Sequence, residues 1–238
     1  MTISAPLRTA LTVATISFLS VGVSVKAQAL SLTVGAPGDP GSGNCAPFGC
    51  AIRYQQVYNS NLFSSPFNIN TLSFFNKNYS SGSISAANYL VRLSTTDKAV
   101  NGLSSTFDDN TGADSQVFFQ GNLGGPIVGG KFDISGNSFA YDPSKGNLLL
   151  DILKSGGGRD FSVSIDSRNG TADPGSISRV YSFDSSAIGS PTDNYGLVTQ
   201  FNGSAAAIPT PALLPGLIGL GMGVLRKRKA ESAESSEA

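Results

Sequence analysis

Histidine and tryptophan are both absent from this 238-residue sequence, and only two cysteines occur in it. Without histidine, the Ser-His-Asp and Cys-His arrangements of nucleophilic catalysis are impossible. A zinc site needs about four ligands, so two cysteines without histidine nearly exclude one. These absences predict a protein that is not an enzyme and that binds no cofactor.

Glutamate is almost as scarce, because its three occurrences, Glu231, Glu234 and Glu237, all lie in the C-terminal tail. Between Leu30 and Ala207 the acids are thirteen Asp against ten Lys and Arg, a net charge of −3. That charge is too small and too scattered to indicate a nucleic-acid partner. The same segment is poor in good helix formers and rich in Ser, Gly, Asn and Thr, which favour turns.

Short apolar or alternating runs recur between these turn formers, and no window shows a helical period. This pattern predicts an all-β domain over residues 30–204, an antiparallel β-sandwich that is jelly-roll-like. The expected strands are residues 30–34, 52–58, 69–75, 88–95, 116–120, 132–135, 138–141, 148–153, 161–167, 178–183 and 195–201. Residues 35–50, 96–115, 121–130 and 168–175 are expected to be loops, and 202–211 a linker.

Cys45 and Cys50 are separated by Ala-Pro-Phe-Gly. Outside the cytoplasm, an even pair of cysteines indicates a disulfide. A redox pair more often has two intervening residues, so the bond is expected to fasten a surface loop.

Three further constellations are candidates for binding or chemistry. Asp108, Asp109, Asn110 and Asp114 gather oxygen ligands around a glycine, which makes them a weak calcium candidate, although a closing Glu is missing. Tyr54 and Tyr58 lie on one strand, and an exposed tyrosine could stack on a sugar ring; the favoured alternative is that Phe and Tyr fill the core, because tryptophan is absent. Paired aspartates could hydrolyse a glycan, but Asp39, Asp142 and Asp173 sit beside turn formers, where Asp caps the backbone.

The N-terminus carries the features of a signal peptide over residues 1–29. Arg8 precedes an apolar run over residues 10–25, and Ala27-Gln28-Ala29 has the form of a signal-peptidase site. Cleavage after Ala29 would leave Leu30 as the first residue. Lys26 leaves an N-terminal membrane anchor as the alternative.

At the other end, residues 205–225 form a stretch of 21 residues without a charge. Arg226, Lys227, Arg228 and Lys229 follow it, and then a polar tail over residues 230–238. A hydrocarbon layer roughly 30 Å thick can take up such a stretch but not four adjacent cations. The basic cluster is therefore expected on the cytoplasmic side, with the β-rich domain outside.

This C-terminal layout resembles the PEP-CTERM class of sorting signals, in the variant with the motif Pro-Thr-Pro-Ala. The motif is Pro209, Thr210, Pro211 and Ala212, followed by a glycine-rich apolar helix and the basic cluster, together residues 205–229. The resemblance implies cleavage near the motif by an exosortase, a membrane Cys protease-transpeptidase. It also implies a bacterium, of cyanobacterial type, that makes exopolysaccharide.

Residues 141–152 and 195–201 also resemble β-rich domains that precede this kind of signal, which bears on fold more than on function. We therefore expect an exported protein of the cell surface or extracellular matrix, with a structural or adhesive role. Its expected partners are signal peptidase, the secretion machinery, an exosortase, the membrane and exopolysaccharide. A carbohydrate-binding module is the alternative, and an Asp-dependent glycan hydrolase is the third.

Overall fold

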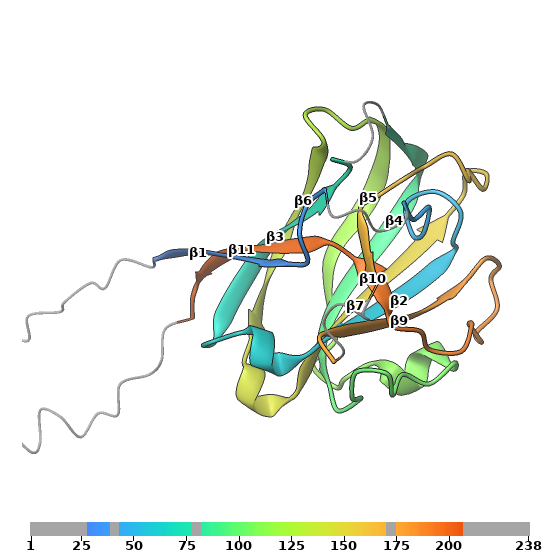
Figure 1. The fold of residues 1–238 in the computed structure, drawn as a ribbon. Helices are drawn as coiled ribbons and strands as arrows, with labels where there is room; N and C mark the ends of the chain where they lie inside the picture. Colours follow the sequence, from blue (N-terminus) through green and yellow to red (C-terminus); the bar gives the residue numbers. More distant parts are fainter. Residues whose placement is uncertain (1–27, 39–42, 78–81, 170–174, 207–238) are drawn as a thin grey trace, which may run out of the picture.

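The computed structural model describes residues 28–38, 43–77, 82–169 and 175–206, and it confirms the predicted all-β, antiparallel class (Figure 1). Apart from three short 3-10 turns, the regular elements of these residues are strands. The strands are β1 (Ala29–Val34), β2 (Arg53–Tyr58), β3 (Phe67–Phe75), β4 (Ser83–Thr96), β5 (Gln116–Pro126), β6 (Lys131–Tyr141), β7 (Asn147–Ser155), β8 (Ser167–Asn169), β9 (Ile177–Ser182), β10 (Tyr195–Leu197) and β11 (Thr199–Ala205). The 3-10 turns are η1 (Ser60–Leu62), η2 (Phe107–Asn110) and η3 (Pro143–Lys145).

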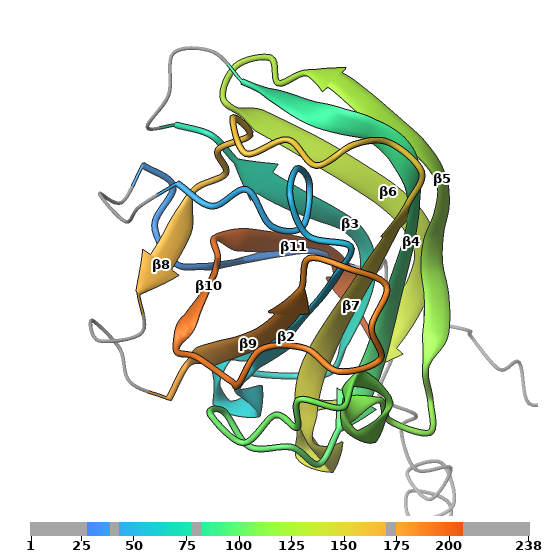
Figure 2. The same ribbon diagram turned by 90° about the vertical axis from the view of Figure 1, so that its right-hand side faces the viewer.

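Two sheets pack face to face, consistent with a β-sandwich. Sheet I has the order β1-β11-β3-β6, and sheet II has the order β5-β4-β7-β2-β9. The short strands β8 and β10 pair with each other, and every strand pairing is antiparallel. Figures 1 and 2 show the sheets facing each other across a shared interior.

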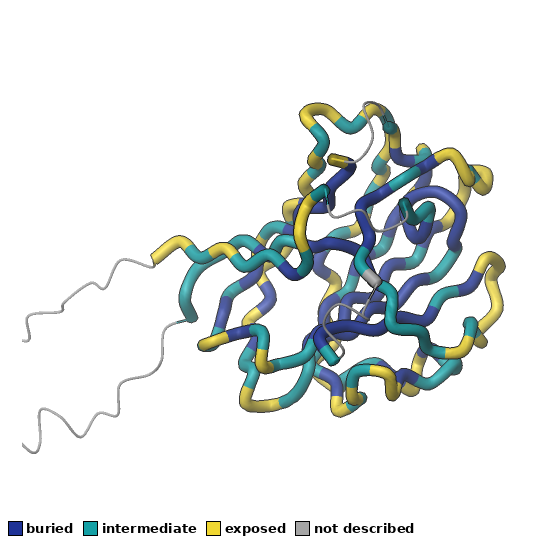
Figure 3. Tube along the Cα trace, in the orientation of Figure 1, coloured by how far each residue is buried: buried dark blue, intermediate teal, exposed yellow. Residues whose placement is uncertain are grey.

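Strand alternation builds the core, because every second side chain of a strand points to the facing sheet. The core is aromatic: Tyr58 of sheet II meets Phe201 of sheet I with ring centroids 4.9 Å apart. Phe63, which follows η1, packs edge-on against Tyr141 at 4.8 Å. With no tryptophan available, Phe and Tyr supply the large buried surface. Figure 3 shows buried positions running along both sheets and exposed ones in the connections and along the strands β5 and β6.

The predicted disulfide between Cys45 and Cys50 is present. It closes a loop whose central residue, Phe48, is fully buried and contacts the rings of Phe74 and Phe132, both at 4.8 Å. The loop is therefore more than a surface turn. It inserts an aromatic side chain into one end of the sandwich.

A second, smaller cluster lies on the outer face of sheet II, beneath the β4–β5 connection (residues 97–115). Leu103 and Phe107 of this connection are buried against apolar side chains of β2, β7 and β9. The sheet residues of this cluster are Val57, Leu149 and Val180. The connection thus covers part of a sheet face that would otherwise be open to solvent.

Several predicted boundaries were wrong. Residues 161–167 form no regular strand before β8, because Asp160 turns the chain by accepting from the N–H and hydroxyl of Ser162. Residues 132–135 and 138–141 belong to one strand, β6, which passes through Gly136 where a Cβ would meet the carbonyl of Phe118. The expected loop at residues 121–130 is strand as far as Pro126, and the expected linker is strand as far as Ala205.

Residues 1–27 of the predicted signal peptide, the C-terminal apolar segment from residue 207 and the polar tail lie outside the described residues, whereas Gln28 and Ala29 are described. Ala205 and Ala206, the first residues assigned to the sorting signal, are described and continue from β11. Within the described ranges, no helix has the length and apolar character needed to cross a membrane.

The disulfide should contribute measurably to stability because it closes a loop in the unfolded chain. Replacing Cys45 and Cys50 together by Ala is expected to lower the free energy of unfolding by about 2 kcal/mol. Urea unfolding monitored by circular dichroism measures this value. Ser185→Ala, on an exposed connection, is the control. An unchanged unfolding midpoint in the double variant would contradict the prediction.

Stability should also fall in alkaline solution. Burial raises the pKa of Tyr54, Tyr58, Tyr89 and Tyr141 above that of a free tyrosine, about 10. Above that pH the unfolded chain releases phenolic protons that the folded chain keeps, so the folded state becomes less favourable as pH rises. Below it, this contribution is fully present. Urea unfolding at several pH values between about 8 and 11 measures the slope, which Tyr89→Phe should reduce.

Candidate functional site

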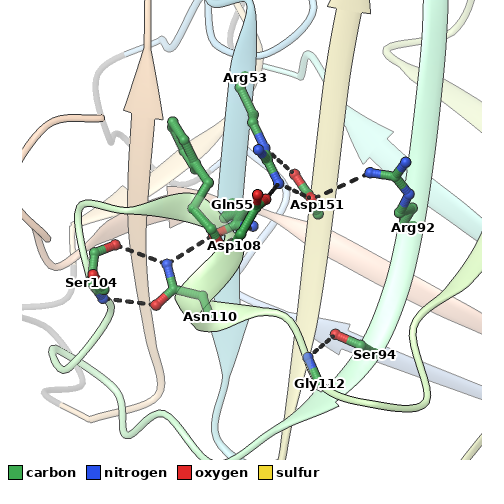
Figure 4. A network of polar contacts seen from close by, with 10 residues as sticks. Arg53, Gln55, Arg92, Ser94, Ser104, Asp108, Asn110, Gly112 and Asp151 are labelled. Carbon is green, nitrogen blue, oxygen red and sulfur yellow. Dashed lines mark hydrogen bonds and ion pairs between the residues drawn. The ribbon is translucent and has the colours of Figure 1, made fainter. Parts of the chain in front are cut away.

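A charged cluster occupies the outer face of sheet II, beside the β4–β5 connection (Figure 4). Arg53 comes from β2, Asp151 from β7 and Arg92 from β4, while Asp108 approaches from η2. Register places Asp151 directly opposite Arg92 on one side and Gln55 on the other. Arg53 lies two residues before Gln55 on the same side of β2, and its side chain reaches diagonally across to Asp151 on β7.

Arg53 is held on three sides. Its Nε donates to Oδ1 of Asp151 at 3.2 Å and its Nη2 to Oδ2 at 2.9 Å. The same Nη2 donates to Asp108 Oδ1 at 3.0 Å, and the guanidinium lies 4.7 Å from the centre of the Phe107 ring. Burial alone would lower the pKa of Arg53, but its hydrogen bonds and attraction to Asp151, and then to Asp108, raise it. The guanidinium is therefore a fixed, permanently charged donor.

An amide network fastens η2 to the sheet beneath it. Asn110 donates to Gln55 Oε1 at 2.9 Å and to the carbonyl of Ser104 at 2.8 Å. Gln55 in turn donates to the carbonyl of Phe107 at 3.0 Å. Because Asn110 and Gln55 are both buried, these bonds satisfy groups that would otherwise be costly to desolvate.

The calcium candidate does not assemble into a cation site. Asp108 pairs with Arg53, Asn110 is buried in the amide network, and Asp114 accepts from the backbone N–H of Thr95 at 2.7 Å. Asp109 accepts from the hydroxyl of Ser104 at 3.1 Å. Their oxygens serve separate structural contacts. Within the part of the chain that the structure describes, no group of three or more His, Cys, Asp or Glu side chains could hold a metal ion.

The proposed sugar contact of Tyr54 and Tyr58 is wrong, because both side chains are fully buried. Their side of β2 faces sheet I, where the Tyr58 hydroxyl donates to Thr199 Oγ1 at 2.8 Å. Gln56, on the same side, donates to the carbonyl of Leu197 at 3.1 Å. The strand over residues 52–58 was correctly inferred, but nothing in its sequence distinguishes the inner from the outer side.

Next to the charged cluster lies a pocket of about 740 Å³. It is formed by the start of β2, by the end of β7 with the residues after it, and by the connection that follows β9. The lining residues are 52–53, 153–157, 159 and 183–187. Arg53 thus belongs both to the ion-pair cluster and to the pocket wall. A pocket of this size lies within the range of small-molecule sites, roughly 300–1,000 Å³.

The far wall of the pocket carries an aromatic ring and a carboxylate. Phe183 is 38% exposed and its ring lies 5.2 Å from that of Tyr181. Asp184 accepts from the backbone N–H of Ser186 and from the Ser182 hydroxyl, which lower its pKa, and Arg159 adds a smaller attraction. Asp184 therefore stays a carboxylate at neutral pH.

Lys154 connects this region to the disulfide loop. Its ammonium is buried and donates to the carbonyls of Gly49 and, at 3.0 Å, of Gly158. Burial lowers its pKa, which the nearby Asp160 partly opposes. The contact holds residues 156–159 in place at the edge of the pocket.

The remaining predicted residues lie either outside the described ranges or elsewhere in the fold. Ala27, the motif at 209–212 and the basic cluster at 226–229 lie outside the described residues. Ala29 begins β1, opposite Ser204. Asp142 caps η3 by accepting from the N–H of Ser144, as inferred for aspartates next to turn formers.

Asp108 and Asp151 are the two carboxylates that share Arg53, but their arrangement is that of an ion pair. Both Asp151 oxygens accept from Arg53, and the side chain is only 4% exposed. Sequence reasoning missed Arg53, Asp151 and the pocket. The available signal was an acid within the apolar run Leu148–Leu153, because a charge there needs a partner. No protein-family model, curated protein or solved structure matches the chain.

The Arg53–Asp151 pair should be needed for stability. Arg53→Met removes both Arg53 hydrogen bonds from the buried Asp151 carboxylate, leaving only Arg92 at 3.9 Å, and is expected to cost about 3–5 kcal/mol of unfolding free energy. Replacing both residues, Arg53→Met with Asp151→Leu, should recover most of that loss, because the buried carboxylate is removed as well. Urea unfolding of the wild type, Arg53→Met, Asp151→Leu and the double variant forms a double-mutant cycle, and Arg159→Ala is the exposed control. Equal losses in the single and double variants would contradict the coupling.

Proposed function

We propose that this protein is an exported domain of the cell surface or extracellular matrix, with an adhesive or structural role, held by its C-terminal segment. The observation that carries the proposal is the antiparallel pairing of β1 with β11. Ala29 lies opposite Ser204, and the N–H of Ala205 donates to the carbonyl of Gln28 at 3.1 Å. The chain therefore enters and leaves the domain at one place, so a leader and an anchor would attach side by side.

The sequence supports the same direction of export. Cleavage after Ala29 would remove a single residue of β1 and leave Leu30–Val34 paired with residues 199–203 of β11. The apolar stretch and the cations at 226–229 would then hold the precursor until an exosortase acts at Pro209, Thr210, Pro211 and Ala212.

Figure 1 supports a domain whose pocket lies on the side opposite its chain ends. The described chain ends lie on one side of the molecule, at β1 and β11, and the connections after β7 and β9 project on the opposite side. The pocket is built from those two connections and the adjoining strands. An anchor at the chain ends would leave the pocket directed away from the membrane.

As part of the same proposal, the strand order is that of a jelly roll. Sheet I (β1-β11-β3-β6) faces β2-β7-β4-β5 of sheet II, and β9 is an added edge strand. Four strands per sheet, with the chain crossing repeatedly between sheets, fit that description. A carbohydrate-binding module is the second candidate, favoured by the pocket beside Arg53.

Processing can be read from the intact mass of the protein recovered from cells. We expect loss of residues 1–29 and a second cleavage near residues 209–212. Pro209→Ala with Pro211→Ala should retain the C-terminal segment, whereas Pro191→Ala, an exposed proline in the β9–β10 connection, should be processed normally. An unprocessed wild-type mass would contradict exosortase sorting. Digestion of the domain by protease added only to the cytosolic side of sealed vesicles would contradict its export.

A further inference from the structure

The pocket beside Arg53 combines an apolar ring with hydrogen-bonding groups of both kinds. Phe183 presents part of its ring, and Asp184 is an acceptor on the same wall. Ser155, Ser185 and Ser186 add exposed lining residues with hydroxyl groups, which both donate and accept. Such a mixture complements a ligand that has C–H surface and many hydroxyl groups.

Arg53 supplies a donor whose direction is fixed. Its Nε and Nη2 are occupied by Asp151 and Asp108, and the side chain remains 15% exposed. Within the described residues Nη1 makes no hydrogen bond of its own, and Arg53 lines the pocket. Because Phe107 and two carboxylates already hold the group, a ligand would not have to immobilise it.

Exposed aromatic surface extends from the pocket. Phe161 is 66% exposed, and its ring centroid lies 6.1 Å from that of Phe183, which contacts Tyr181. Phe161 and Phe183 thus place two large rings next to each other in solvent. Contiguous exposed apolar groups at a pocket mark binding sites more often than scattered ones do.

The charges around the pocket balance. The cations Arg53, Arg92 and Arg159 are matched by the acids Asp108, Asp151 and Asp184. Lys154 is buried on backbone carbonyls, with Asp160 nearby. A balanced surface of this kind gives no net attraction to an anionic polymer.

We propose that this pocket binds a segment of a neutral glycan, with a sugar ring on Phe183 and its hydroxyl groups on Arg53, Asp184 and the serines. The biological setting rests on the proposed function, because an exported domain meets extracellular polysaccharide. The recognition itself depends only on the pocket residues.

Titration calorimetry of the full-length protein in detergent tests the proposal. The probes are cellohexaose, xylohexaose and mannohexaose as neutral glycans, and oligoguluronate as an anionic one. We expect at least one neutral hexaose to bind, with an affinity that changes less than about twofold between roughly 0.05 and 0.5 M NaCl. Phe183→Ser should weaken binding at least about tenfold, and Ser185→Trp should block the pocket.

Val128→Ser is the matched control, because Val128 is an exposed apolar residue in the β5–β6 turn, outside the pocket. It should bind like the wild type, and all three variants should keep the wild-type melting temperature. Three results would overturn the proposal: no binding of any neutral probe, unchanged binding by Phe183→Ser and Ser185→Trp, or a salt-sensitive preference for oligoguluronate. A correctly exported and processed protein with any of these results would refute the glycan site alone.

Discussion

A carboxylate buried in the middle of sheet II organises the outer face of this domain. Asp151 lies on the central strand β7, where an isolated negative charge would be very costly. Arg53 compensates it with two hydrogen bonds and is itself covered by Phe107 and contacted by Asp108. These contacts draw η2 onto the sheet, and the amides of Gln55 and Asn110 hold it there. The ion pair, the amides and the buried side chains of Leu103 and Phe107 together place the β4–β5 connection, and Arg53 also forms part of the pocket wall.

The space between the sheets is organised differently, because there the facing sheets bury mainly apolar and aromatic side chains. The loop that carries Phe48 connects the core between the sheets with the pocket region. This disulfide-closed loop fills one end of the core, and the carbonyl of Gly49, which follows Phe48, accepts from buried Lys154. Lys154 also binds the carbonyl of Gly158, at the rim of the pocket. The disulfide loop thus supports the core directly and the pocket through a single side chain.

Sequence reasoning reached the fold class and most strands because alternation and turn formers are local signals. It missed what depends on contacts distant in sequence. Arg53 and Asp151 are 98 positions apart, and the pocket joins residues near 52, 155 and 185, so neither forms a recognisable motif. The inner or outer side of β2 was equally open, so the sequence left both a sugar contact and a core position for Tyr54 and Tyr58, and the structure places both in the core. The expected strands over residues 132–135 and 138–141 were separated at Gly136, which lies within β6, where a close backbone approach requires glycine.

The balance of charge in the pocket also has a structural origin. Only 13% of the residues are charged, and on sheet II the charged side chains near the pocket are used to neutralise one another. Arginines that are paired with carboxylates in this way still donate hydrogen bonds in fixed directions, but they produce no long-range electrostatic field. Under the proposed glycan site, selectivity would come from shape, from the ring of Phe183 and from the fixed donor of Arg53, all of which act only at contact. An exported surface domain with such a site would discriminate by fit, and its binding would be insensitive to the ionic strength of its surroundings.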